Sequence, residues 1–199
     1  MKRALLPLAL LAVAAAPAPK IDHLAPIALR PGSNRVPGFL PGGGAATIIE
    51  AWRGNGNAHG YHVWMVLTGP SEGNPVGVAS TADGGEIIRD APFDGERVLG
   101  TVRFARATLG GAPASLVLSA RLDTTPGRPL ADHEHASVRV DRLVKTGDGI
   151  GPPLQFRTIA TLHSERRYCN ADLALRDLLG VPLPVGFSGA NRTDGCSVH

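Results

Sequence analysis

Four of the seven histidines stand in two close pairs that resemble metal ligands. His59 and His62 flank Gly60-Tyr61, and His133 and His135 flank Glu134. Alternate residues of a strand point to the same side, about 7 Å apart, and imidazole nitrogens bind zinc. If the two pairs meet across a sheet, they predict a zinc site and a metal-dependent hydrolase.

The alternative interpretation of these histidines is that they are solvated residues at a strand edge. The segment 132–135 reads Asp-His-Glu-His and follows a turn at Thr125-Pro126-Gly127. No H-E-x-x-H helix, which would hold zinc on one face, is present. We therefore favour a chain without a cofactor and keep the zinc hydrolase as the second hypothesis.

A second group of polar and aromatic residues lies between 52 and 61. It combines aromatic planes with amide and guanidinium donors, as sugar-binding or peptide-binding surfaces do; its members are Trp52, Arg53, Asn55, Asn57 and Tyr61. The alternative is a tight turn, because Gly and Asn are frequent in turns for backbone reasons, with Trp52 and Trp64 packed in the core.

Motifs for nucleophilic catalysis and for phosphate binding are absent from the sequence. There is no S-x-x-K and no G-x-x-x-x-G-K-[ST]. The segment that most resembles a nucleophile elbow, Gly186-Phe187-Ser188-Gly189-Ala190, lacks the final glycine and lies in the tail. A triad assembled from distant residues stays open, since triads form in space.

The first 18 residues have the three parts of a secretory signal peptide. Lys2 and Arg3 precede an apolar run over 4–16, and small residues follow with cleavage sites after Ala16 or Ala18. The run is shorter than the roughly 20 residues that a lasting membrane helix needs. We expect an exported protein, periplasmic or extracellular, with no transmembrane anchor after cleavage.

Charge and cysteine content agree with this location. The chain has 20 basic and 17 acidic residues, and loss of Lys2 and Arg3 leaves 18 basic residues, a net charge of about +1. So small an excess argues against a nucleic-acid partner. Cys169 and Cys196 are the two cysteines, and in an exported chain they predict a structural disulfide.

The elements that position these residues are mostly strands. Residues 19–44 are interrupted by Pro26, Pro31, Pro37 and Pro41 and end in three glycines, which predicts an irregular leader, extended or mobile. Apolar alternation then predicts strands over 46–52, 61–68, 98–109, 115–122, 135–144 and 154–163. Gly110-Gly111 is predicted to form the turn of one hairpin. In its second strand, Ser115, Val117, Ser119 and Arg121 share a face that we expect to be largely solvated. In its first strand the apolar alternation changes phase near Ala105, which indicates either a β-bulge or an early end of the strand.

One helix is expected after residue 170. Asn170 caps it, Asp172 lies in its first turn, and Gly180 followed by Pro182 ends it. The chain is therefore predicted to be mainly β, an antiparallel β-sandwich or partly open barrel with one short C-terminal helix, in a single domain over 45–199. The favoured function is an exported, non-catalytic β module that binds an envelope or extracellular partner.

Overall fold

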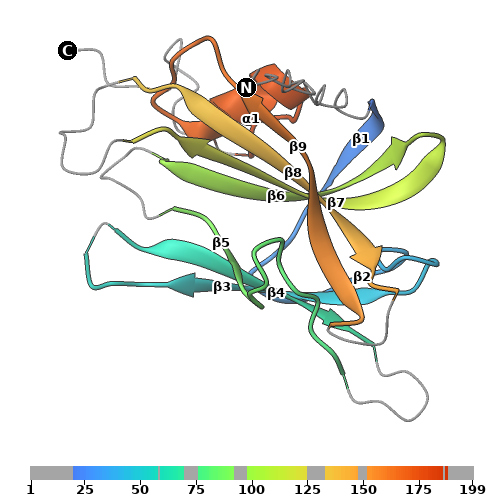
Figure 1. The fold of residues 1–199 in the computed structure, drawn as a ribbon. Helices are drawn as coiled ribbons and strands as arrows, with labels where there is room; N and C mark the ends of the chain where they lie inside the picture. The colour runs from blue at the N-terminus through green and yellow to red at the C-terminus, as the bar shows by residue number, and fades with distance from the viewer. Residues whose placement is uncertain are drawn as a thin grey trace, which may run out of the picture.

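Two antiparallel sheets and one helix make up the chain over residues 20–57, 59–69, 76–91, 98–124, 133–147, 152–185 and 187, which the computed structural model describes (Figure 1). One sheet has the order β1-β6-β7-β8-β9 and the other β2-β3-β4-β5. Their bounds are β1 Ile21–Ile27, β2 Gly32–Val36, β3 Ala46–Arg53, β4 Tyr61–Thr68, β5 Ile88–Arg89, β6 Gly100–Leu109, β7 Ala112–Leu122, β8 Ala136–Lys145 and β9 Leu154–His163.

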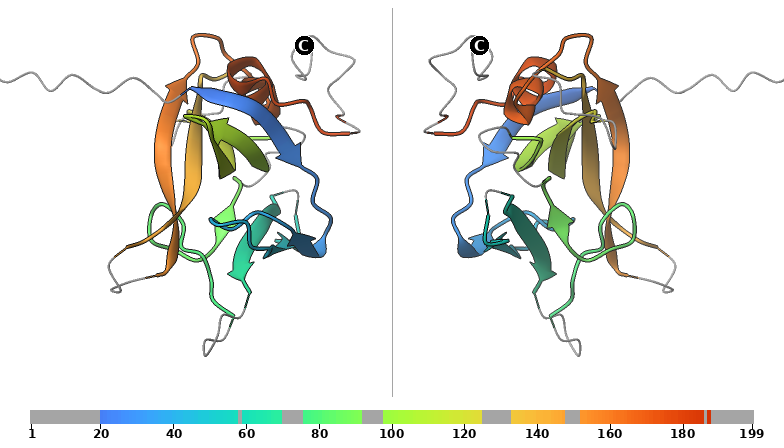
Figure 2. Two further views of the ribbon diagram at one scale, coloured as in Figure 1. Left: turned by 90° about the vertical axis from the view of Figure 1, so that its right-hand side faces the viewer. Right: turned by 90° about the vertical axis from the view of Figure 1, so that its left-hand side faces the viewer.

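The layers are a helix, the five-stranded sheet and the four-stranded sheet, stacked in that order (Figure 2). One apolar core lies between the helix and the five-stranded sheet, and includes Leu116, Leu118 and Val138. A second core lies between the two sheets, and includes Ile48, Phe104 and Phe156. The predicted mainly β, sandwich-like fold with one short helix is confirmed, and the sheets do not close into a barrel.

The β6–β7 hairpin closes through two residues. Gly110 and Gly111 have φ angles of 56° and 82°, and Leu109 pairs with Ala112 directly across the turn. Two successive positive φ angles are what a two-residue turn between twisted strands requires, and glycine adopts them without steric cost. The hairpin predicted from the Gly-Gly pair is confirmed.

The phase slip in β6 has a different cause from the one predicted. Pairing with β7 is regular from Gly100 to Leu109, so there is neither a bulge near Ala105 nor an early end. Val102 and Phe104 pack between the sheets, whereas Ala105 and Ala107 pack toward the helix. The strand is buried on both faces, which removes the apolar–polar alternation from its sequence.

A true bulge lies in β9. Val140 pairs with Ala160 but its neighbour Asp141 pairs with Thr158, which leaves Ile159 as the extra residue. Leu154 and Phe156 therefore pack between the sheets, while Ala160 and Leu162 pack toward the helix. Regular alternation along 154–163 predicts one common face for these four side chains; that prediction is wrong, because a bulge reverses the alternation.

The segment 19–44, predicted to be irregular, contributes two strands. β1 pairs with β6 at one edge of the five-stranded sheet, and β2 pairs with β3 at one edge of the four-stranded sheet. Pro26 is tolerated within β1 because a proline at a sheet edge removes no ladder hydrogen bond that the sheet needs. Phe39, just beyond β2, is fully buried, so this segment belongs to the folded body.

The predicted helix is α1, Ala171–Leu179. The Asn170 side chain accepts a hydrogen bond from the Asp172 amide, and Gly180 ends the helix with φ 70° and an N–H bond to the Arg176 carbonyl. Buried Asp172 accepts hydrogen bonds from Thr101 at 2.9 Å and Arg103 at 2.5 Å, which ties the first turn to β6. No helix within the described ranges has the length and apolar character to cross a membrane.

Candidate functional site

The face of the five-stranded sheet that looks toward the other sheet changes character halfway along. On β7, Val117 is 2% exposed in the core between the sheets, and the next residues on that face are Ser119 and Arg121. On β8 the pairing places Asp141, Arg139 and Ser137 opposite Val117, Ser119 and Arg121. The apolar half is covered by the second sheet, and the polar half faces a cavity.

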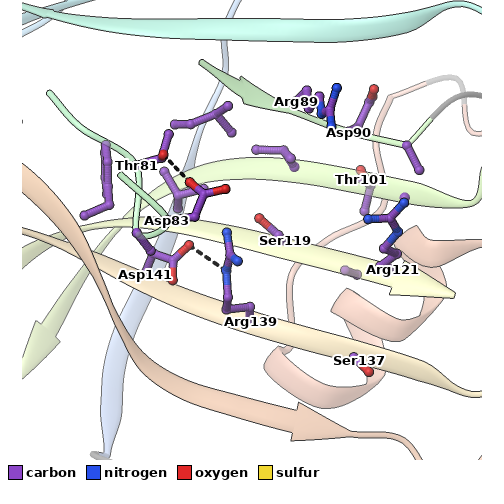
Figure 3. A pocket seen from close by; sticks show the side chains of 18 of the residues that line it. Thr81, Asp83, Arg89, Asp90, Thr101, Ser119, Arg121, Ser137, Arg139 and Asp141 are labelled. Carbon is purple, nitrogen blue, oxygen red and sulfur yellow. Dashed lines mark hydrogen bonds and ion pairs between the residues drawn. The ribbon is translucent and has the colours of Figure 1, made fainter. Parts of the chain in front are cut away.

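The cavity has a volume of about 580 Å³ and lies between the polar half of this face and β5 (Figure 3). Its floor is formed by polar side chains of β7, β8 and β9, and its walls by the segment that leads into β5, by the start of β4, and by the apolar core. The lining includes Tyr61, Thr81, Asp83, Ile87, Ile88, Arg89, Asp90, Val102, Val117, Ser119, Arg121, Ser137, Arg139, Asp141, Phe156 and Thr161.

The segment 76–91 joins the edges of the two sheets beside the cavity. Val78 bridges to Leu67 of β4, and Ser80 bridges to Gln155 of β9. Two backbone hydrogen bonds hold the second bridge, Ser80 N–H to the Leu154 carbonyl at 3.0 Å and Phe156 N–H to the Ser80 carbonyl at 2.8 Å. This connection fixes one wall of the cavity to the sheet that forms its floor.

Asp141 is the most deeply buried charged residue of the floor. Its side chain is 3% exposed; Oδ1 accepts the Thr158 hydroxyl at 2.7 Å and Oδ2 accepts Arg139 Nε at 2.9 Å. The bulge at Ile159 is what places Thr158 opposite Asp141. Both carboxylate oxygens are thus occupied, which a buried carboxylate requires.

The other two carboxylates of the lining also have partners in the fold. Asp90 accepts the His62 backbone N–H at 2.8 Å, and its second oxygen lies 3.2 Å from His62 Nδ1. Asp83 accepts a hydrogen bond from the Thr81 hydroxyl, which outweighs partial burial and, with backbone N–H groups, lowers the pKa of Asp83. The cavity's carboxylates are therefore occupied as acceptors by groups of the protein itself.

The arginines of the lining keep donors available. Arg139 uses Nε for Asp141, its side chain is 45% exposed, and its two terminal nitrogens form no further bond within the described residues. Arg121 and Arg89 are exposed and form no hydrogen bond or ion pair with the described part of the chain. The groups that the cavity offers to a ligand are thus guanidinium donors, with the hydroxyls of Ser119 and Thr161 beside them.

A serine, a histidine and an aspartate meet at the outer end of the floor, but in an order that does not activate the serine. Ser137 Oγ donates to Asp123 Oδ1 at 2.7 Å, and His163 Nδ1 lies 3.2 Å from the same Oγ. In a catalytic triad the carboxylate orients the histidine and the histidine takes the serine proton. Here the serine hydroxyl donates its hydrogen bond to the carboxylate, so the three residues form a polar network.

The predicted ligand surface at residues 52–61 is divided between two faces. Trp52 pairs with His62, and Arg53 pairs with Tyr61, so adjacent pairs point to opposite sides of the sheet. Asn55 donates to the His59 carbonyl and Asn57 accepts the His59 N–H, so both amides hold the turn. Tyr61 is the one predicted residue that also lines the cavity.

The two tryptophans, Trp52 and Trp64, differ in burial. Trp64 is 5% exposed in the core, as its alternative interpretation predicts, but Trp52 is 51% exposed and is not a core residue. The Trp52 ring contacts His62 edge-on at 4.8 Å, over Gly60, where a Cβ would lie 2.1 Å from the indole. His62 in turn stacks on Trp64 at 5.6 Å.

The four histidines predicted as metal ligands do not gather into one site. His59 lies in the β3–β4 turn and His62 on β4, where it contacts Asp90, whereas His133 and His135 precede β8 of the other sheet. His135 Nδ1 lies 3.0 Å from the Ser164 carbonyl. Among the described residues, no three or more His, Cys, Asp or Glu side chains are placed to hold a metal ion.

The predicted disulfide falls partly outside the described part of the chain. Cys169 is 1% exposed and stands directly before the helix cap Asn170, but Cys196 lies outside the described residues, as does the signal segment 1–18. Both assignments stay predictions.

Ser119, Arg121, Ser137, Arg139, Asp141 and Thr161 were not recognised from the sequence as site residues. The available signal is that three successive strands each carry polar residues at alternate positions: Ser-x-Arg in β7, Ser-x-Arg-x-Asp in β8 and Thr-x-His in β9. We assigned the β7 set to a wet outer face, which the second sheet shows to be the inner face.

Comparison with known proteins gives a fold likeness. No family model matches the chain, and no curated protein is similar to it. The solved crystal structure of CarG superposes with a TM-score of 0.62 and 16% sequence identity, over 76% of this chain and 94% of CarG. At this identity the likeness establishes a shared fold.

Proposed function

We propose that this protein is an exported, non-catalytic binding module that takes a small ligand into the cavity between its two sheets. The observation that carries the proposal is the division of one sheet face into a buried apolar half and an open polar half. A volume of about 580 Å³ is within the range of small-molecule sites.

The polar half is difficult to explain by stability alone. The inner faces of a sandwich ordinarily fill with apolar side chains, which stabilise the fold by about 25 cal/mol per Å² buried. Here Ser119, Arg121 and Arg139 occupy those positions on two central strands. Polar groups kept beside a core but left available to solvent are typical of a site for a ligand.

Absence of catalysis is supported by the state of the candidate groups. The Ser137 hydroxyl proton is directed to Asp123, away from His163. The carboxylates Asp90 and Asp141 are held by donors of the fold. These contacts favour recognition of a ligand over its chemical conversion.

Native mass spectrometry of the protein isolated from the cells that export it tests the binding proposal. We expect a non-covalent adduct in the wild type and its loss in Ser119→Phe, whose ring projects from the floor into the space that the ligand would occupy. Ser33→Phe, on the exposed edge strand β2, is the matched control and should keep the adduct. Failure to find an adduct in any sample, or its retention in folded Ser119→Phe, would overturn the proposal.

Export is tested by the intact mass of the same material. We expect a chain that begins after Ala16 or Ala18, because the small residues there are suited to signal peptidase. Recovery of a full-length chain from the medium or envelope would contradict cleavage.

A further inference from the structure

Resting on the proposed function, we infer that the ligand is an organic acid: an apolar body that carries a carboxylate or phosphate group. The inference combines two properties of one cavity. Its lining presents arginine donors, and its wall presents partly exposed apolar side chains.

Two arginines stand on the same face of adjacent strands. Ser119 of β7 pairs with Arg139 of β8, and Arg121 pairs with Ser137, so Arg121 and Arg139 are diagonal neighbours. Diagonal neighbours in a sheet are about 7–8 Å apart, within reach of two long side chains that converge on one group. Figure 3 shows both on the same side of the sheet, with Arg139 beside Asp141.

The hydrogen-bonding state of the cavity selects an acceptor ligand. Arg139 retains its terminal nitrogens after binding Asp141 through Nε, and Arg121 has no partner among the described residues. The planar guanidinium binds carboxylate and phosphate oxygens in pairs, which neutral acceptors do not match. The lining also holds Asp83, Asp90 and Asp141; both oxygens of Asp90 and of Asp141 have partners within the fold, and one oxygen of Asp83 accepts the Thr81 hydroxyl.

The exposed apolar side chains of the wall select an apolar body. Val102, Val117 and Phe156 close the cavity against the core, but each is at most 4% exposed and presents little surface to a ligand. The apolar surface that a ligand can contact comes from Ile87, which is 54% exposed, and from the partly exposed Ile88 and Tyr61. A ligand that is only an anion would leave this wall in water, and a ligand that is only apolar would leave the arginines unpaired.

Calorimetric titration of the mature chain with four probes separates the contributions. They are 4-phenylbutanoate, phenyl phosphate, the neutral amide 4-phenylbutanamide, and acetate. We expect saturable binding of at least one of the first two, and at least about tenfold weaker binding of the amide and of acetate. The stronger of the two anionic probes identifies carboxylate or phosphate as the preferred group.

Arginine variants test whether the named side chains carry the recognition. Arg121→Gln should weaken the anionic probe about tenfold and leave the amide unchanged, and Arg121→Lys should recover part of the loss, since it restores the charge without the paired donors. Arg35→Gln is the matched control, because it removes one exposed strand arginine of the other sheet. Binding of the anionic probe should also weaken as salt is raised.

The possible outcomes separate this inference from the proposed function. Equal binding of 4-phenylbutanoate and its amide, unaffected by Arg121→Gln but lost in Ser119→Phe, would overturn the organic-acid class and leave a cavity-binding protein. The organic-acid class would also be overturned if neither 4-phenylbutanoate nor phenyl phosphate bound saturably. The proposed function is tested separately, by native mass spectrometry of the protein from the exporting cells, and it fails if no adduct is found there.

Discussion

Arg139 and Asp141 lie two residues apart on the same face of β8 and form an ion pair, with Nε 2.9 Å from Oδ2. The two side chains share the contact but differ in exposure, 45% for the arginine and 3% for the aspartate. The carboxylate is part of the floor and the guanidinium is part of the cavity. The pair therefore links the packing of the sheet to the group that we propose meets the ligand.

We predict that Asp141→Asn destabilises the protein and displaces Arg139. Asparagine cannot form the ion pair, and the loss of a buried, charge-assisted hydrogen bond lowers the free energy of unfolding by about 1–3 kcal/mol. Urea denaturation should show this loss in the free energy of unfolding. Arg139→Gln should also destabilise the protein, because it leaves the buried Asp141 carboxylate with the Thr158 hydrogen bond but without its ion pair. A change under about 0.5 kcal/mol for Asp141→Asn would contradict the role assigned to it.

We predict that part of the acid sensitivity of the fold comes from Asp177 of α1. Burial raises its pKa, but hydrogen bonds from Arg176 and Tyr168 and the charges of Arg176 and Arg166 outweigh this, so the pKa of Asp177 lies below its usual value. A carboxyl with a lowered folded pKa contributes stability above its unfolded pKa, and loses it as the pH falls through the folded value.

The measurement is the free energy of unfolding from pH 7 down to about pH 2, for the wild type and Asp177→Asn. The variant should be less stable at pH 7, and the two curves should converge as the pH falls below about 4. Asp22→Asn is the control, since its partner Lys20 is 85% exposed and surface pairs contribute little. Parallel curves over the whole range would show that Asp177 does not act in this way.

We predict that Cys169 and Cys196 are joined and that the bond holds the end of the chain to the start of α1. Alkylation of the unreduced protein should label no thiol, and labelling of two cysteines should follow reduction in denaturant. Replacing both cysteines by alanine should lower the free energy of unfolding by about 3 kcal/mol in the chain-entropy description. A thiol that reacts before reduction would refute the pairing.

Local signals in the sequence predicted the elements that local rules determine. The Gly110-Gly111 turn and the Asn170 and Gly180 caps act within a few residues, so each could be placed without knowing the rest of the fold. The two strands within 19–44 could not be, because Pro26 within β1 and the prolines on either side of β2 indicate irregular structure unless the strand lies at a sheet edge.

The site was missed for a related reason. Ser119 and Arg121 alternate with buried leucines and so indicate a solvated face, but which face a second sheet covers depends on contacts between distant strands. The bulge at Ile159, which turns Thr158 toward Asp141, leaves no local mark in the sequence. Histidine spacing was a poor guide, because of the four only His62 lies within a strand, and the described residues bring no three possible metal ligands together.

The central claim is that the polar half of this sheet face serves a ligand and not the stability of the fold. The double variant Ser119→Val/Arg121→Leu tests it in one preparation, by its urea denaturation and by its native mass spectrum. We predict a free energy of unfolding equal to or above that of the wild type, because apolar and β-branched residues suit these strand positions, together with loss of the bound adduct. A variant that is less stable by more than about 1 kcal/mol and still carries the adduct would contradict the account.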